Sequence, residues 1–161
     1  MITVDWVLVA DRCHAKILHA LPSTVSKFQT LHSLVHPEGR LTPQEMESDA
    51  PGRVQLAGNA RSTVEPHEDR KQVQSKRFAH EISEILVRES QDRRFDRLFV
   101  IAPPSFLGVL RETWPRIVQD RIALELAKDL MPLAEAELTL RLSEIIASVD
   151  LEAKPHVVGA I

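Results

Sequence analysis

The most constraining feature of this sequence is an unbroken apolar segment that ends at two prolines. Residues 98–102, Leu-Phe-Val-Ile-Ala, contain no polar side chain, and Pro103-Pro104 follows directly. A strand with one face in water would alternate apolar and polar residues, so a continuous run is typical of a central strand covered on both faces. The rest of the chain must therefore supply neighbouring strands and helices for both faces of a sheet.

The residues before this segment predict three strands and a long loop. Residues 4–10 and 15–21 are rich in β-formers and are joined by a short turn, Asp11-Arg12-Cys13, so they predict a hairpin. Residues 27–34 alternate less perfectly and predict a third, more exposed strand. Residues 35–69 hold many prolines and glycines without a sustained apolar period, and a loop this long is usually functional or disordered.

The second half predicts helices that alternate with strands. Apolar residues at steps of three and four predict a helix from Arg70 to Glu89 and another over residues 135–149. Between them, a helix capped by Ser105 is predicted to break at Pro115. Residues 122–127 alternate and favour a fifth strand, although a helix continuing from Arg116 fits almost as well.

This order of elements predicts an α/β fold, with a mixed sheet and helices packed on it. The length of 161 residues suits one domain, which we expect to span residues 1–149, with residues 150–161 as a C-terminal tail. The net charge of −3 does not support a dedicated nucleic-acid binder, but it leaves room for a local basic patch.

Cysteine usage and the N-terminus predict a cytoplasmic protein. Cys13 is the only cysteine, so no intramolecular disulfide can form, which fits a reducing compartment. The N-terminus has no basic start, and Asp5 interrupts its apolar stretch, so it is not a signal peptide. No run of about 18 apolar residues exists, so no membrane span is expected.

Two segments could contact an anionic ligand or a partner. In the loop, Asp49 and Pro51-Gly52 set up a tight turn beyond which Arg53 could grip an anion, although ordinary turn chemistry explains the segment and is favoured. After the buried strand, Ser105, Gly108 and Arg111 begin a helix where α/β folds often bind ligands. There too a structural interpretation is favoured, with Ser105 as a cap and Gly108 allowing close approach to the sheet.

The remaining candidates are weaker. Lys128 and Asp129 follow the fifth strand, where a solvated turn is the favoured interpretation. The seven histidines are scattered and no cysteine cluster exists, so we expect no metal and no cofactor. Cys13 has no activating partner in the sequence beyond its neighbours Arg12 and His14, and the sequence lacks a Gly-x-Ser-x-Gly elbow. The chain is therefore not expected to be an enzyme.

Several segments together resemble the bacterial host-attachment family, which is named for a protein required for attachment to host cells. They follow the family's order from Trp6 to about Leu142. The segments are Trp6-Val7-Leu8-Val9-Ala10-Asp11-Arg12, Ala15-Lys16-Ile17, His36-Pro37-Glu38, Asp49-Ala50-Pro51-Gly52-Arg53, Phe78-Ala79, Glu81-Ile82, Ala102-Pro103-Pro104-Ser105-Phe106-Leu107-Gly108, Leu110-Arg111 and Lys128-Asp129-Leu130.

The resemblance implies more about the fold than about chemistry. The family is similar in fold to the middle domain of archaeo-eukaryotic peptide-chain release factors, which is ribonuclease H-like and has a five-stranded mixed sheet in the order 3-2-1-4-5. Release factors carry Gly-Gly-Gln in the connection after the third strand. Here that connection holds Pro51-Gly52-Arg53, so peptidyl-tRNA hydrolysis is not implied. Ribonuclease H chemistry needs clustered carboxylates. Asp5 lies on the first strand, but the fourth strand ends in Ala-Pro-Pro and supplies no acid, so this activity is not implied either.

Three functions are compatible with these observations. The first is a non-catalytic binding or regulatory module that acts at the ribosome or on structured RNA. The second is an intracellular interaction protein, with a protein partner, that is needed indirectly for attachment to host cells. The third is a hydrolase of an anionic substrate that uses Asp49, Arg53 and Arg111, with Lys128 and Asp129 nearby; it ranks last because no paired base and nucleophile is visible.

Overall fold

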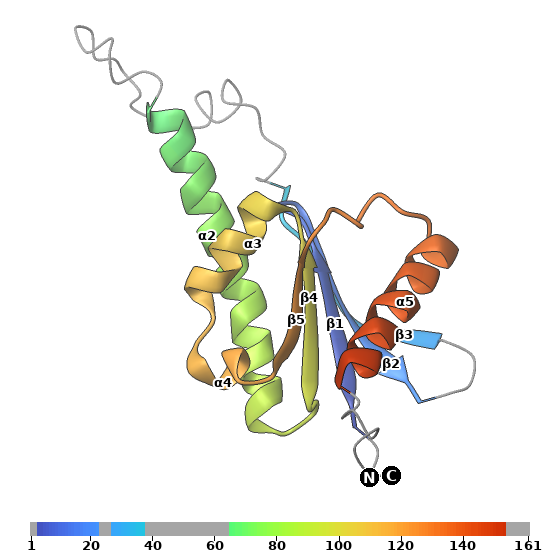
Figure 1. Ribbon diagram of the computed structural model, residues 1–161. Coiled ribbons are helices and arrows are strands. Elements are labelled where there is room, and N and C mark those ends of the chain that lie inside the picture. The colour runs from blue at the N-terminus through green and yellow to red at the C-terminus, as the bar shows by residue number, and fades with distance from the viewer. Residues whose placement is uncertain (1–2, 23–26, 38–64, 154–161) are drawn as a thin grey trace, which may run out of the picture.

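The computed structural model describes residues 3–22, 27–37 and 65–153, without the side chains of 65–69. Five strands form one sheet in the order β3-β2-β1-β4-β5 (Figure 1). The first three strands pair antiparallel, whereas β1 with β4 and β4 with β5 are parallel. The predicted mixed sheet and its strand order are therefore confirmed. The strands are β1 (Asp5–Ala10), β2 (His14–Leu21), β3 (Lys27–Val35), β4 (Arg97–Ala102) and β5 (Ile122–Ala127).

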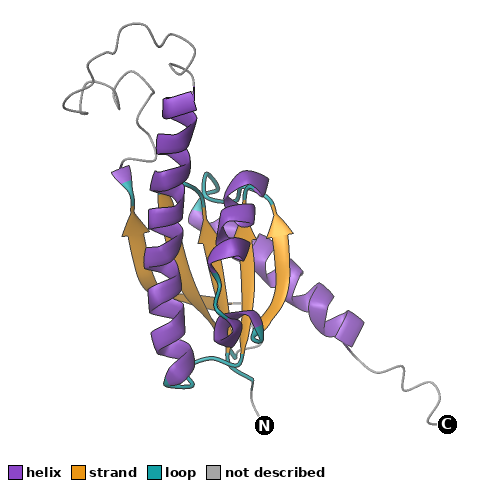
Figure 2. Ribbon diagram, turned by 90° about the vertical axis from the view of Figure 1, so that its left-hand side faces the viewer, coloured by secondary structure: helices purple, strands orange, loops and turns teal. Residues whose placement is uncertain are grey.

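The helices cover both faces of the sheet, as the continuous apolar run requires. Helices α2 (Glu65–Gln91), α3 (Pro104–Thr113) and α4 (Arg116–Gln119) lie on one face, and α5 (Glu135–Ala153) lies on the other (Figures 1 and 2). Residues 98–102 of β4 are all fully buried between these layers. Of the helices in the described ranges, none has the length and apolarity that a membrane span needs.

Alternation along the strands divides the core into two clusters. On β1, Leu8 packs toward α2 and α3, whereas Val7 and Val9 pack toward α5. In the segment 122–127, Leu124 and Leu126 are two residues apart and pack in the second cluster, whereas Ile122 packs in the first, across the register irregularity between Leu98 and Phe99. A helix would place Leu124 on the opposite side from Leu126, whereas a strand places both on one face, so the alternation of apolar residues selects the strand.

Three helix ends differ most from the prediction. Helix α2 begins at Glu65, inside the segment predicted as loop, and α5 runs on to Ala153 instead of ending at Val149. The prediction of Ser105 as N-cap is wrong, because the cap is Pro103 and makes no side-chain hydrogen bond. Pro104 occupies the first turn, where the fixed proline φ suits a helix start and the missing N–H costs nothing, so the helix begins before the serine.

Arg97 joins the amino ends of β1 and β4 to α5. Its guanidinium donates two hydrogen bonds of 2.7 Å, from Nε and Nη2, to the two carboxylate oxygens of Asp5, its register partner. The remaining nitrogen, Nη1, lies 3.0 Å from the Asp150 carboxylate. The hydrogen bonds to Asp5, followed by those to Asp150, raise the pKa of Arg97 above its ordinary value, although partial burial acts the other way. The pair thus holds together the end of the sheet opposite the helix start at Pro104.

Replacing Arg97 with methionine is expected to lower the free energy of unfolding by about 2 kcal/mol, because it leaves the largely buried Asp5 carboxylate without its partner. A raised pKa contributes stability that is lost only as pH rises through the folded value, so the effect should be constant at neutral and mildly alkaline pH. Urea unfolding measures it. Arg116→Met is the control, because Arg116 is 88% exposed in a 3.6 Å pair with Asp120; equal losses for both variants would contradict the prediction.

Candidate functional site

A hollow of about 470 Å³ lies at the carboxyl ends of the parallel strands β1 and β4. We call it the basic hollow. The turn after β1, the first described turns of α2 and the start of α3 line it. Its residues are Arg12, Lys71, Gln72, Ser75, Lys76, Ser105, Gly108, Val109 and Glu112. In open α/β sheets, this edge of the parallel strands is where ligands most often bind.

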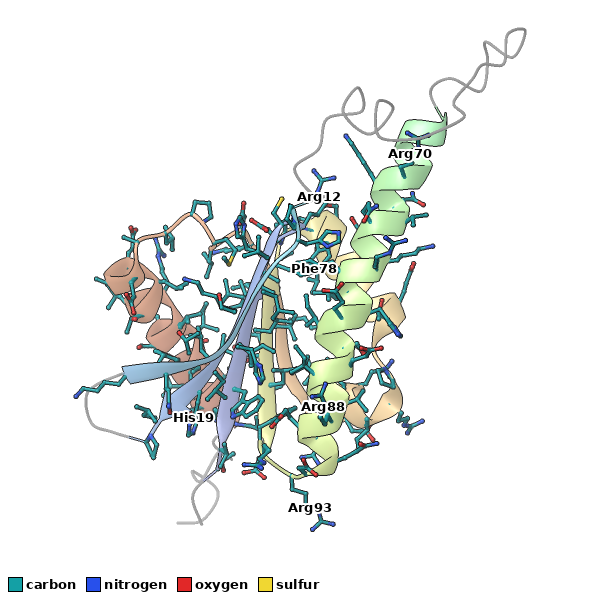
Figure 3. The ribbon with its side chains drawn as sticks, turned by 180° about the vertical axis from the view of Figure 1, so that it is seen from behind. Arg12, His19, Arg70, Phe78, Arg88 and Arg93 are labelled. Carbon is teal, nitrogen blue, oxygen red and sulfur yellow. The ribbon has the colours of Figure 1, made fainter. Side chains whose placement is uncertain are left out.

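Local geometry explains why Arg12 lies at this edge. The turn between β1 and β2 is closed by Asp11, whose Oδ1 accepts hydrogen bonds from the backbone N–H groups of Cys13 (2.7 Å) and His14 (2.6 Å). The short Asp side chain satisfies the turn's own donors, as is typical of Asx turns. Arg12, between them, is left exposed at the tip, and Figure 3 shows it at the same end of the molecule as Arg70.

Helix periodicity places the other lining residues. On α2, Lys71 and Ser75 are four residues apart, as are Gln72 and Lys76, so each pair lies on adjacent turns of the helix. On α3, Ser105 and Gly108 are three residues apart and are neighbours in the same way. The two helices pack against each other through Phe78 and Phe106, whose ring centroids are 5.8 Å apart. The hollow therefore lies at the outer edge of the contact between α2 and α3.

Among the side chains that the structure describes, positive charge dominates the lining of the hollow. The hollow holds three cations, Arg12, Lys71 and Lys76, against one acid, Glu112. Within the described ranges, none of the three cations forms an ion pair. Residues 70–77 of α2 add further basic side chains and contain no acid. In a chain whose net charge is −3, this is a local reversal of sign.

The start of α3 adds uncapped backbone donors. The first helical hydrogen bond runs from Leu107 N–H to the Pro103 carbonyl at 2.8 Å. The N–H groups of Ser105 and Phe106 donate no hydrogen bond to any described residue, because Pro103 has no side-chain oxygen to accept one. Unsatisfied N–H groups at a helix start carry partial positive charge and favour anions.

The structure separates the predicted site residues. Ser105 and Gly108 line the basic hollow, but Arg111 Nε donates a 2.9 Å hydrogen bond to Glu125 of β5. Lys128 lines a different hollow of about 320 Å³ beside α5, with Arg141 and Glu144 on the other side. Asp129 Oδ1 accepts from the Met131 N–H at 3.3 Å. Since α3 and α5 cover opposite faces of the sheet, Arg111 and Lys128 do not share a cleft (Figure 1).

The other predicted residues, Asp49, Gly52 and Arg53, lie outside the described part of the chain. Conversely, sequence reasoning did not select Arg12, Lys71 and Lys76 as site residues. A signal was available, since residues 70–77 hold four cations and no acid. Only the fold brings Arg12 to the same edge.

Gly108 does not serve the packing role expected of it. A Cβ built at this position would meet no atom within 4 Å, so the glycine faces the open hollow and not the sheet.

Gly108→Ala is therefore expected to raise the free energy of unfolding by about 0.5–1 kcal/mol, because alanine is the better helix former and nothing obstructs its methyl group. Urea unfolding of the two proteins measures the change. A clear destabilisation would contradict the open position assigned to Gly108.

Carboxylates do not gather for metal chemistry in the residues that the structure describes. No group of three or more histidine, cysteine, aspartate or glutamate side chains there could hold a metal ion. Asp5, the acid on the first strand, lies at the amino end of β1 and is engaged by Arg97 through both oxygens. It is thus at the opposite end of the strand from the basic hollow.

Comparisons with known proteins agree with the resemblance seen in the sequence. A family model described as "Protein required for attachment to host cells" matches residues 6–142. No curated protein matches the chain. Among solved structures, it is similar to a crystal structure of an archaeal translation termination factor, aRF1, with 11% identity, a TM-score of 0.44, and coverage of 98% of this chain and 41% of that one. This chain thus spans about two fifths of that protein's length, and such low identity says nothing about a shared activity. Because the family model covers most of its residues, the chain belongs to the family of proteins required for attachment to host cells.

Proposed function

We propose that this chain is a non-catalytic binding module of the cytoplasm that docks on structured RNA, such as that of the ribosome, through the basic hollow and the adjoining cations of α2. The observation that carries the proposal is the meeting of Arg12, Lys71 and Lys76 at one edge of the sheet, without ion-pair partners among the described residues. RNA helices are recognised largely through their phosphates and shape, which such a surface suits.

Two features favour binding over hydrolysis. Arg111, the residue that a hydrolase of anionic substrates would use, is held by Glu125. Among the residues that the structure describes, the lining of the hollow offers cations, hydroxyls and amides. Glu112 is the one acid among them; it is exposed and has no histidine, cysteine or second acid beside it in that lining. An acid and a base, or a nucleophile and its activator, would have to converge for catalysis.

The family's description supports a second role, in the attachment of the bacterium to host cells. A protein required for attachment to host cells could act through translation of attachment factors, or by contacting a protein partner inside the cell. We propose the indirect, intracellular route, in which the RNA-binding surface is the working part and attachment is a consequence.

Sedimentation of cell lysates tests the proposal. The native protein should travel with ribosomal fractions at low salt and be released as salt rises, because neutralising phosphates frees counterions. Fractions treated with ribonuclease should lose the protein. Absence from ribosomal fractions at both low and raised salt, together with no binding to purified structured RNA, would reject the proposed function.

A further inference from the structure

We propose that the basic hollow contains a binding site for a single phosphate group, centred between Ser75 of α2 and the uncapped start of α3. The inference deepens the proposed function, because a phosphate of RNA is one source of such a group. It adds different atoms, however: a nearly buried hydroxyl and backbone donors in the lining of the hollow, beside the cations that the proposed function uses.

Ser75 is the first of these donors. Ser75 is only 7% exposed, yet it lines the hollow. A helical serine commonly donates to the carbonyl four residues earlier, as Thr113 does to Val109 and Ser143 to Thr139. Ser75 makes no such bond and forms no other hydrogen bond with the described residues. Its hydroxyl is also not among the side-chain atoms that are shut off from solvent and lack a hydrogen-bond partner. A nearly buried hydroxyl that lines the hollow, and whose donor no described residue uses, points to a ligand.

The start of α3 supplies donors from the facing wall. The N–H groups of Ser105 and Phe106 are unused by the residues that the structure describes, and Ser105 lines the hollow with Ser75. Adjacent N–H groups in the first turn of a helix suit the oxygens of a phosphate, because several donors then address one anion and the helix dipole adds to the attraction.

Charge and space fit the same ligand. Arg12, Lys71 and Lys76 can neutralise a dianion, and Glu112 reduces but does not cancel their excess. Gly108 leaves the middle of the α3 wall without a side chain, and a Cβ there would meet nothing within 4 Å. The volume of about 470 Å³ exceeds that of a phosphate, so the group that carries the phosphate can extend out of the hollow.

Calorimetric titration with inorganic phosphate, at constant ionic strength with chloride as the reference anion, tests the site. The full chain should bind one phosphate saturably. Gly108→Leu should weaken binding by tenfold or more, because the added side chain fills the space that the anion needs. Ser75→Ala should weaken it by roughly threefold to tenfold, as expected for one lost hydrogen bond to a charged group.

Ser90→Ala is the matched control. Ser90 is also a buried serine of α2 whose Oγ has no partner in the described structure, but it lies outside the hollow. Its substitution should leave phosphate affinity unchanged. Circular dichroism shows whether each variant folds, and if Gly108→Leu does not, Ser75→Ala decides. Absence of saturable phosphate binding, or equal affinity in the wild type and the Ser75→Ala variant, would overturn the inference.

Two further titrations identify the source of the phosphate. Tighter binding of a nucleoside monophosphate than of an unphosphorylated RNA oligomer would assign the site to a terminal phosphate, whereas the reverse would assign it to the RNA backbone. RNA binding that survives Gly108→Leu, in a protein that never binds phosphate, would reject this site and leave the proposed function standing. Phosphate binding without any RNA or ribosome binding would reject the proposed function and leave the site.

Discussion

Phe78→Ala is expected to lower the free energy of unfolding by about 3–5 kcal/mol, the usual cost of emptying a buried aromatic position. Phe78 is fully buried. Its ring stacks on His36 at the end of β3, with centroids 4.9 Å apart, and on Phe106 of α3 at 5.8 Å. Removing it would leave a cavity where α2, α3 and the sheet meet, directly beneath the helices that form the basic hollow. Equilibrium urea unfolding measures the loss.

Val73→Ala provides the control for this prediction. Val73 lies on the same helix but is 51% exposed, so its truncation should change stability by no more than about 0.5 kcal/mol. Because domains of this size are stable by only about 5–15 kcal/mol, the Phe78 variant should lose a large share of its stability. A loss below about 1 kcal/mol would mean that α2 does not pack on α3 and the sheet in the way described.

The second large effect concerns RNA. Reversing three charges together, Arg12→Glu, Lys71→Glu and Lys76→Glu, is expected to weaken binding to structured RNA by roughly a hundredfold or more at low salt. The slope of the logarithm of affinity against the logarithm of salt concentration should also become shallower by about three, close to one for each lost phosphate contact. Filter binding or fluorescence anisotropy across a salt series measures both quantities.

A triple reversal at the other end of the molecule is the matched control. Arg88, Arg93 and Arg116 are all exposed, and Figure 3 shows Arg88 and Arg93 far from Arg12 along α2. Changing all three to glutamate alters the net charge by the same amount. If the control variant loses as much affinity as the basic-hollow variant, RNA binding depends on overall charge alone, and the basic hollow is not its site.

The fold could be read from the sequence because it rests on local periodicity. The continuous run 98–102 predicted a strand covered on both faces, and each of its residues is fully buried. The spacing of Phe78, Ile82 and Leu86 predicted the buried side of α2. Element ends were predicted less well, since Pro103 and not Ser105 is the N-cap of α3. The interactions that keep α5 helical to Ala153 include the distant pair of Asp150 with Arg97.

The candidate site was predicted only in part. Ser105 and Gly108 lie at the predicted strand-to-helix junction, where the sequence alone points to a site because the chain leaves a buried strand at its carboxyl end. Arg111 was a candidate contact residue at the same junction, yet it pairs with Glu125, which no local pattern could reveal because the two residues belong to different elements.

The sequence by itself determined the sheet, its covering on both faces and the family, because these follow from the order and periodicity of apolar residues and from motifs along one chain. Only the tertiary structure decided which polar groups meet. Arg12 joins Lys71, Ser75 and the start of α3 because a parallel pairing of β1 with β4 brings the ends of both strands to one edge. Contacts of this kind depend on packing between distant segments, so the spacing of residues within any one segment does not predict them.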